Sequence, residues 1–191
     1  MSVSAQEFEV DGIYYNITSW EDKTVEVKSG RPKSSGVVTI PQYVVNYNNG
    51  DTYRVTSIGD KAFKDCDGLT SVVIPESVTS IENENFAYCK NMTSFYISSE
   101  IKSIGGNAFY ECFNLVDILI GAEKVIKIVK EVFSQDTYNK ATLYVPYISV
   151  ADYKATYPWN LFNIIGKEFT DINNVLMNKK GTGGSTVRKG S

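Results

Sequence analysis

The sequence predicts a repeat solenoid, in which short parallel strands of successive coils stack along one axis. Two observations support this prediction. A block of 23 residues recurs three times without a gap, beginning at Val55, Val78 and Ile101. The apolar residues fall at the same places in each block, as expected when one coil cannot bury its own apolar side and must share a core with its neighbours.

Six columns of residues define the unit. They are Ile58, Ile81 and Ile104; Phe63, Phe86 and Phe109; Cys66, Cys89 and Cys112; Leu69, Met92 and Leu115; Val72, Phe95 and Ile118; and Ile74, Ile97 and Ile120. The alternation over residues 72–74 predicts a short strand whose middle residue points away from the core. The spacing of Ala62, Phe63 and Cys66 predicts one helical turn that packs inward.

Partial copies flank the three blocks. Phe133 matches Phe109 at a shift of 24 residues, and Leu143 matches Ile118 at a shift of 25. These matches predict a fourth, degraded unit. Upstream, Val38 aligns with the strand position of the first unit, from which an Asn-rich insertion over residues 46–51 separates it.

The unit also has the order of a known repeat. Residues 58–63 read IGDKAF, and a cysteine, a leucine and the strand VVIP of residues 72–75 follow. This order resembles the BspA-type leucine-rich repeat of bacterial surface and secreted proteins, over roughly residues 36–146. The second unit departs from it, because Glu82 replaces the glycine and Asn85 replaces the alanine.

The resemblance implies a leucine-rich-repeat fold of short parallel strands and short helical turns. It also implies a secreted or cell-surface bacterial protein that binds or adheres to a protein partner. Host matrix or plasma proteins, such as fibronectin and fibrinogen, are the partners that the resemblance suggests, although a fold does not by itself determine a function.

We expect the following organisation. Residues 1–6 are a remnant of an export signal or a frayed terminus, 7–35 an N-terminal β cap, 36–146 the solenoid, 147–169 a C-terminal cap and 170–191 a flexible tail. Asp11-Gly12 predicts a hairpin turn in the first cap. In the second, Ser149 is expected to cap a helix that Pro158 ends, before Trp159, Phe162 and Ile164 or Ile165 cover the last coil.

Composition limits the function classes. The chain has 191 residues, of which 42% are hydrophobic, and a net charge of −3. This charge gives no basic field for nucleic acid, and no apolar run reaches the roughly 18 residues of a membrane helix. Histidine is absent, which removes the commonest general base, the Ser-His-Asp triad and most zinc sites. We therefore expect no catalytic residue, no cofactor and no metal, and the chain is not expected to be an enzyme.

Two polar columns have structural explanations. The three cysteines recur among core positions, which predicts buried free thiols that act as small apolar groups. A disulfide would leave one cysteine over, and a metal would need a further ligand. Ser57, Ser80 and Ser103 also recur, and we expect them to hydrogen-bond neighbouring backbone.

One column is the candidate partner site. It consists of the outward strand residues Val73, Tyr96, Leu119 and Tyr144, with Thr39 beginning the row. Apolar and aromatic side chains at outward positions indicate a binding surface. The alternative is ordinary packing between neighbouring strands.

Two function hypotheses follow. The first is a non-catalytic binding or adhesion module that recognises a protein partner through the solenoid face. The alternative is a structural or envelope scaffold that binds glycans or displays another domain. A protein-binding face should be broad and continuous, whereas a glycan site should be a local groove with paired aromatic rings and amides.

Overall fold

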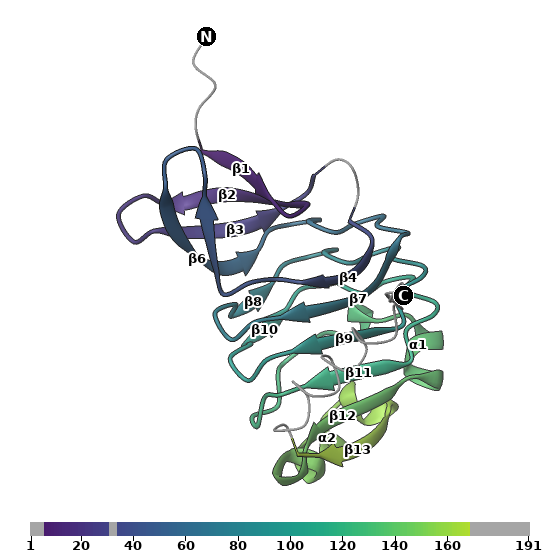
Figure 1. Ribbon diagram of the computed structural model, residues 1–191. Helices are drawn as coiled ribbons and strands as arrows, with labels where there is room; N and C mark the ends of the chain where they lie inside the picture. Colours follow the sequence, from purple (N-terminus) through teal and green to yellow (C-terminus); the bar gives the residue numbers. More distant parts are fainter. Residues whose placement is uncertain (1–5, 31–33, 169–191) are drawn as a thin grey trace, which may run out of the picture.

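The computed structural model describes residues 6–30 and 34–168, which form coils stacked along one axis (Figure 1). The expected tail over residues 170–191, and the first five residues, lie outside the described part of the chain.

A six-stranded parallel sheet runs along one side of the stack. Its strands, in spatial order, are β4 (Gly36–Thr39), β7 (Leu69–Ile74), β9 (Ser94–Ile97), β11 (Asp117–Ile120), β12 (Thr142–Pro146) and β13 (Asn163–Lys167). Val72 pairs with Phe95, Phe95 with Ile118, and Ile118 with Leu143. The predicted register, including that of the fourth unit, is therefore confirmed.

A second series of short strands forms another side of each coil. Strand β6 (Asp51–Ile58) pairs in parallel with β8 (Ser80–Ile81), which pairs with β10 (Ser103–Ile104). The isoleucines at the ends of these strands are buried, with 5% exposure or less. Each unit therefore meets its neighbour along two ladders that enclose one core.

The helical turn expected at Ala62 to Cys66 is not formed. The N–H groups of Ala62, Lys64 and Cys66 donate to carbonyls three residues back, which makes a chain of linked turns. Between them, the N–H of Phe63 donates to the carbonyl of Asn85 in the next unit, at 2.9 Å. Left-handed backbone at Lys61 (φ 58°) and Asp65 (φ 59°) interrupts any helix, because a right-handed helix requires negative φ.

Helices appear only from the fourth unit onward in the described residues. They are the 3₁₀ helix η1 (Lys130–Val132), α1 (Gln135–Lys140), η2 (Tyr147–Ser149), α2 (Val150–Ala155) and η3 (Trp159–Leu161). Ser149 does not cap α2 with its side chain, because its hydroxyl donates to the carbonyl of Glu123 at 2.7 Å. Helix α2 ends at Ala155, three residues before Pro158.

The phenylalanine column forms a continuous stack through the core. Ring centroids lie 5.2 Å apart for Phe63 and Phe86, 5.1 Å for Phe86 and Phe109, and 5.3 Å for Phe109 and Phe133. Their planes are nearly parallel, within 10°. Each ring therefore fills space between two coils, and its removal would affect both.

The three cysteines are buried thiols that form no disulfide, as expected. Their thiols also have a polar role, because Cys89 donates to the carbonyl of Phe63 and Cys112 to that of Phe86, each at 3.1 Å. The cysteine column therefore satisfies one carbonyl of the preceding coil in addition to packing in the core.

The first strands of the chain lie at the start of the stack (Figure 1). Strands β1 (Glu7–Val10), β2 (Ile13–Ser19) and β3 (Thr24–Lys28) are antiparallel, and β3 pairs in parallel with β6. The hairpin turn predicted at Asp11-Gly12 is present. The Asn-rich residues 46–51 form the turn of a further hairpin, because β5 (Tyr43–Asn46) pairs antiparallel with β6.

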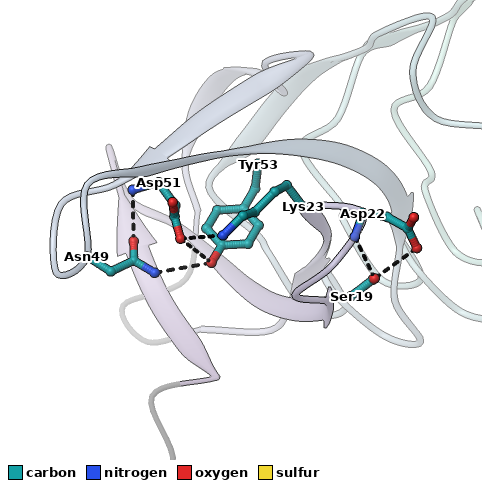
Figure 2. Close-up of polar contacts among 6 residues, drawn as sticks. All are labelled: Ser19, Asp22, Lys23, Asn49, Asp51 and Tyr53. Atoms are coloured by element: carbon teal, nitrogen blue, oxygen red, sulfur yellow. Dashed lines mark hydrogen bonds and ion pairs between the residues drawn. The ribbon is translucent and has the colours of Figure 1, made fainter.

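A polar cluster joins the β2–β3 turn to the β5–β6 turn (Figure 2). Lys23 Nζ lies 2.6 Å from Asp51 Oδ2, and the amide of Asn49 donates to the Tyr53 hydroxyl at 3.1 Å. Ser19 and Asp22 bond to each other within the first turn. The hydrogen bond between Lys23 and Asp51 raises the pKa of the lysine and lowers that of the carboxyl. Because these polar groups bond to one another, the cluster holds the β2–β3 turn against the β5–β6 turn.

Residues after the fourth unit continue the sheet. Trp159 is buried and its indole N–H donates to the carbonyl of Ile126 at 2.6 Å. Phe162 and Ile164 are buried beside it, whereas Ile165 is exposed. Strand β13 pairs in parallel with β12, so this segment adds a strand to the stack as well as aromatic packing.

Candidate functional site

The predicted outward row is continuous across the parallel sheet. Val73 pairs with Tyr96, Tyr96 with Leu119, and Leu119 with Tyr144. The register places Thr39 before Val73, as predicted, and Ile165 after Tyr144. Ile165 was not predicted as a member of the row, because the repeat columns are recognisable by eye in the sequence only as far as about residue 146.

Exposure differs along the row. Val73, Tyr96 and Tyr144 are half-buried, while Thr39 and Ile165 are exposed. Leu119 is only 7% exposed, so at this position the alternative of packing between neighbouring strands holds, and Leu119 adds little accessible surface to the row. Its cross-strand neighbours are two tyrosines at a spacing of about 4.8 Å, and large side chains on both sides leave little of a leucine accessible.

Charged groups lie next to both tyrosines. Burial, and then the carboxylate of Glu76, raises the pKa of the Tyr96 hydroxyl. Burial, and then Asp117, raises the pKa of the Tyr144 hydroxyl. Lys167 Nζ lies 4.3 Å from the centroid of the Tyr144 ring, within cation–π distance. Both hydroxyls therefore remain protonated at neutral pH.

A second row on the same face is polar. Ser71 pairs with Ser94, and Ser94 with Asp117. The hydroxyls of the two serines lie 3.0 Å apart and hydrogen-bond to each other, and both residues are buried. The outward face thus combines an apolar and aromatic row with a polar row that is partly satisfied within itself.

The column of Ser57, Ser80 and Ser103 forms no candidate site. Ser80 and Ser103 pair between β8 and β10, and the Ser80 hydroxyl donates to the Glu82 carboxylate at 3.0 Å. The expected bond to backbone is therefore wrong for Ser80, whose hydroxyl bonds instead to Glu82, the residue that replaces the repeat's glycine. Within residues 6–30 and 34–168, no three His, Cys, Asp or Glu side chains gather as metal ligands would.

One hollow lies beside the sheet. It measures about 640 Å³ and lies in the loops that follow β9 and β11. Its charged residues alternate in sign, with Glu100 and Glu123 beside Lys102 and Lys124. Its apolar lining is aliphatic, from Ile101, Ala122, Val125 and Ile126, and no aromatic side chain is among its lining residues.

No helix in the described part of the chain is long and apolar enough to cross a membrane.

The family profile described as "BspA type Leucine rich repeat region" matches residues 52–175, in six copies. No curated protein sequence matches the chain. Among solved structures, a leucine-rich repeat protein from Bacteroides capillosus is similar, with 28% identity and a TM-score of 0.61, over 73% of this chain and 98% of that one.

Two longer structures are also similar. A leucine-rich repeat protein from Bacteroides ovatus shares 28% identity with a TM-score of 0.53, over 84% of this chain and 41% of that one. A leucine rich cell surface protein from Faecalibacterium prausnitzii shares 23% identity with a TM-score of 0.52, over 78% of this chain and 38% of that one. The last shows the fold alone, and this chain spans about two-fifths of each longer protein.

Proposed function

The chain belongs to the BspA-type leucine-rich repeat family, and we propose that it is a non-catalytic module that binds a protein partner through the outward face of its parallel sheet. The observation that carries this proposal is the in-register row Val73, Tyr96, Leu119 and Tyr144. Solvent-facing strand positions are polar by default, and the partly exposed Val73, Tyr96 and Tyr144 of this row depart from that default.

The size of the row suits part of a protein epitope. At about 4.8 Å between strands, four residues span on the order of 15 Å. A stable interface buries about 800 Å² on each partner, so Thr39, Ile165 and the flanking loops must contribute. Tyr96 is our choice for the energetic anchor, because tyrosine is enriched among residues that dominate binding energy.

The organisation of the chain supports this role. We infer that residues 7–35 and 147–169 act as caps on a solenoid of residues 36–146. Val25 and Val27 of β3 are fully buried at one end, and Trp159 at the other. Caps of this kind would shield the open ends of the core and prevent edge-to-edge association.

We propose a secreted or cell-surface location in bacteria. The family resemblance supports it, and one similar structure is described as a leucine rich cell surface protein. The absence of histidine from the sequence supports a non-catalytic role. Host matrix and plasma proteins remain the proposed partner class.

The test is a binding panel with matched variants. Immobilised wild-type chain, Tyr96→Ala and Tyr43→Ala are exposed to purified matrix and plasma proteins, including fibronectin and fibrinogen. Tyr43 is an exposed tyrosine on β5, outside the row. We expect wild type to bind at least one protein and Tyr96→Ala to weaken that binding at least about tenfold, which corresponds to about 1.4 kcal/mol.

Tyr43→Ala should bind like wild type, because it leaves the row intact. The proposal fails if the wild-type chain binds no protein of the panel. It fails equally if Tyr96→Ala binds like wild type.

A further inference from the structure

Two hollows flank Tyr110, and none of their lining residues belongs to a strand of the parallel sheet. One measures about 340 Å³ and is lined by Glu84, Tyr88, Asn107 and Tyr110, among others. The other measures about 420 Å³ and shares Asn107 and Tyr110 with the first. These two residues border both hollows, which together reach from the second unit to the fourth, and we call the pair of hollows the tyrosine groove.

Aromatic rings line the groove where the repeat does not require them. Tyr88 and Tyr110 lie with ring centroids 5.8 Å apart at an angle of 82°. Phe113 lines the larger hollow and is 40% exposed, and Tyr110 is 37% exposed. The equivalents of Phe113 in the first two units are Asp67 and Lys90. An exposed phenylalanine at this position is therefore particular to the third unit.

Polar groups surround these rings. The larger hollow is lined by the amides of Asn107 and Gln135 and by the hydroxyl of Ser134. The Ser134 hydroxyl is already fixed, because it accepts the backbone N–H of Glu111 at 2.8 Å. Amides and hydroxyls both donate and accept hydrogen bonds, so they match ligands that carry hydroxyl groups.

The charge of the groove opposes an anionic ligand. Glu111, Glu131 and Asp136 line the larger hollow beside a single cation, Lys130. At the other end, Glu84 is paired with Lys64, whose ammonium lies 5.4 Å from the centroid of the Tyr88 ring. At the smaller hollow the charge of Glu84 is therefore neutralised by Lys64, whereas the larger hollow has three carboxylates and one ammonium group.

We propose that the tyrosine groove binds a neutral glycan. The C–H face of a sugar ring would lie against Tyr110 and Phe113, and its hydroxyls would bond to Asn107 and Gln135. The volume of the larger hollow, about 420 Å³, lies within the range of about 300–1,000 Å³ that small-ligand sites occupy. Carboxylates accept hydrogen bonds from hydroxyls strongly but repel phosphate, sulfate and sialic acid groups, which selects an uncharged sugar.

The site is independent of the protein-binding face. The sheet face is broad and continuous, whereas the tyrosine groove is local and combines paired rings with amides. A protein partner on the sheet and a glycan in the groove would therefore be held by different residues of the same coils.

The experiment is a glycan array followed by calorimetry with the best neutral oligosaccharide. Phe113→Lys gives the third unit the lysine that the second unit has at the equivalent position, Lys90. Because this position is exposed, the unfolding midpoint should stay that of wild type. We expect this variant to bind the oligosaccharide at least about tenfold more weakly. Tyr43→Ala is the matched control, because it removes an exposed ring on β5 that lines neither hollow.

The expected result is binding of neutral glycans by wild type, Tyr43→Ala and Tyr96→Ala, and its loss in Phe113→Lys. Three results would overturn the proposal. They are no neutral glycan retained by wild type, retention of anionic glycans only, and equal affinity of Phe113→Lys and wild type. Loss of glycan binding in Tyr96→Ala would assign the sugar to the sheet face and would equally refute the groove.

Discussion

The interior phenylalanine stack and the outward row on the sheet come from the same repeat but differ in composition and burial. The interior positions Phe63, Phe86 and Phe109 keep one residue type, and their rings lie within 5.2 Å of the next centroid. The outward positions change from valine to tyrosine to leucine. Interior packing must mesh with two neighbours and tolerates little change, while an outward position is free to vary with a partner.

The largest expected effect comes from opening the stack. Phe86→Ala removes a fully buried ring between two others, and such truncations lower the free energy of unfolding by about 3–5 kcal/mol. Urea unfolding measures the change. Phe113→Ala is the control, since that ring is largely outside the core, and it should lower stability far less. If Phe86→Ala and Phe113→Ala lowered the free energy of unfolding equally, the difference in stability between the interior stack and the surface would be contradicted.

The buried cysteines make the interior sensitive to alkali. Burial raises the pKa of the Cys112 thiol to about 12, whereas a thiol in the unfolded chain ionises near 8.5. Between these values the unfolded state binds fewer protons, so stability falls as pH rises, by about 1.4 kcal/mol per pH unit for one thiol. Urea unfolding at pH 8 and at pH 10 measures this effect. From pH 8 to pH 10, the free energy of unfolding should fall less for Cys112→Ala than for wild type. An identical drop would contradict this origin.

A buried amide marks a weak point of the interior. Asn85 stands where the first and third units have Ala62 and Ala108, and it is fully buried. Its Oδ1 has no hydrogen-bond partner among the described residues, and its Nδ2 donates to Ile58 over a long 3.4 Å. Asn85→Ala should therefore raise the free energy of unfolding by about 1 kcal/mol.

A second asparagine provides the matched control for that change. The Asn91 amide donates to the carbonyl of Asp67 at 2.8 Å, so Asn91→Ala should lower stability. The urea unfolding midpoint should rise in Asn85→Ala and fall in Asn91→Ala, relative to wild type. A loss of stability in Asn85→Ala would contradict the assignment of an unsatisfied amide.

The repeat made the fold and its register predictable. Apolar residues at one interval determine which side chains share a core, and this holds even for Leu143 in the degraded fourth unit. The linked turns could not be predicted, because Lys61 and Asp65 adopt left-handed backbone without being glycines. Their conformation depends on bonds to the next coil, which local propensity does not contain.

The sites were predictable to different degrees. The outward row followed from strand alternation, but the burial of Leu119 depends on the sizes of its cross-strand neighbours. The tyrosine groove was missed, although Phe113 departs from the polar residues of the other units. That departure was the available signal, but the groove also needs Ser134 and Gln135 from the irregular fourth unit.

The central claim is that the interior stack supplies stability while the outward row supplies binding. The most direct test is the shift in unfolding midpoint caused by the matrix or plasma protein that wild type binds, because a ligand of the folded state stabilises it. Phe86→Leu should have a lower midpoint alone and still show the shift. Tyr96→Ala should differ from wild type by about 1 kcal/mol or less alone and lose most of the shift. A full shift in Tyr96→Ala, or none in folded Phe86→Leu, would contradict the account.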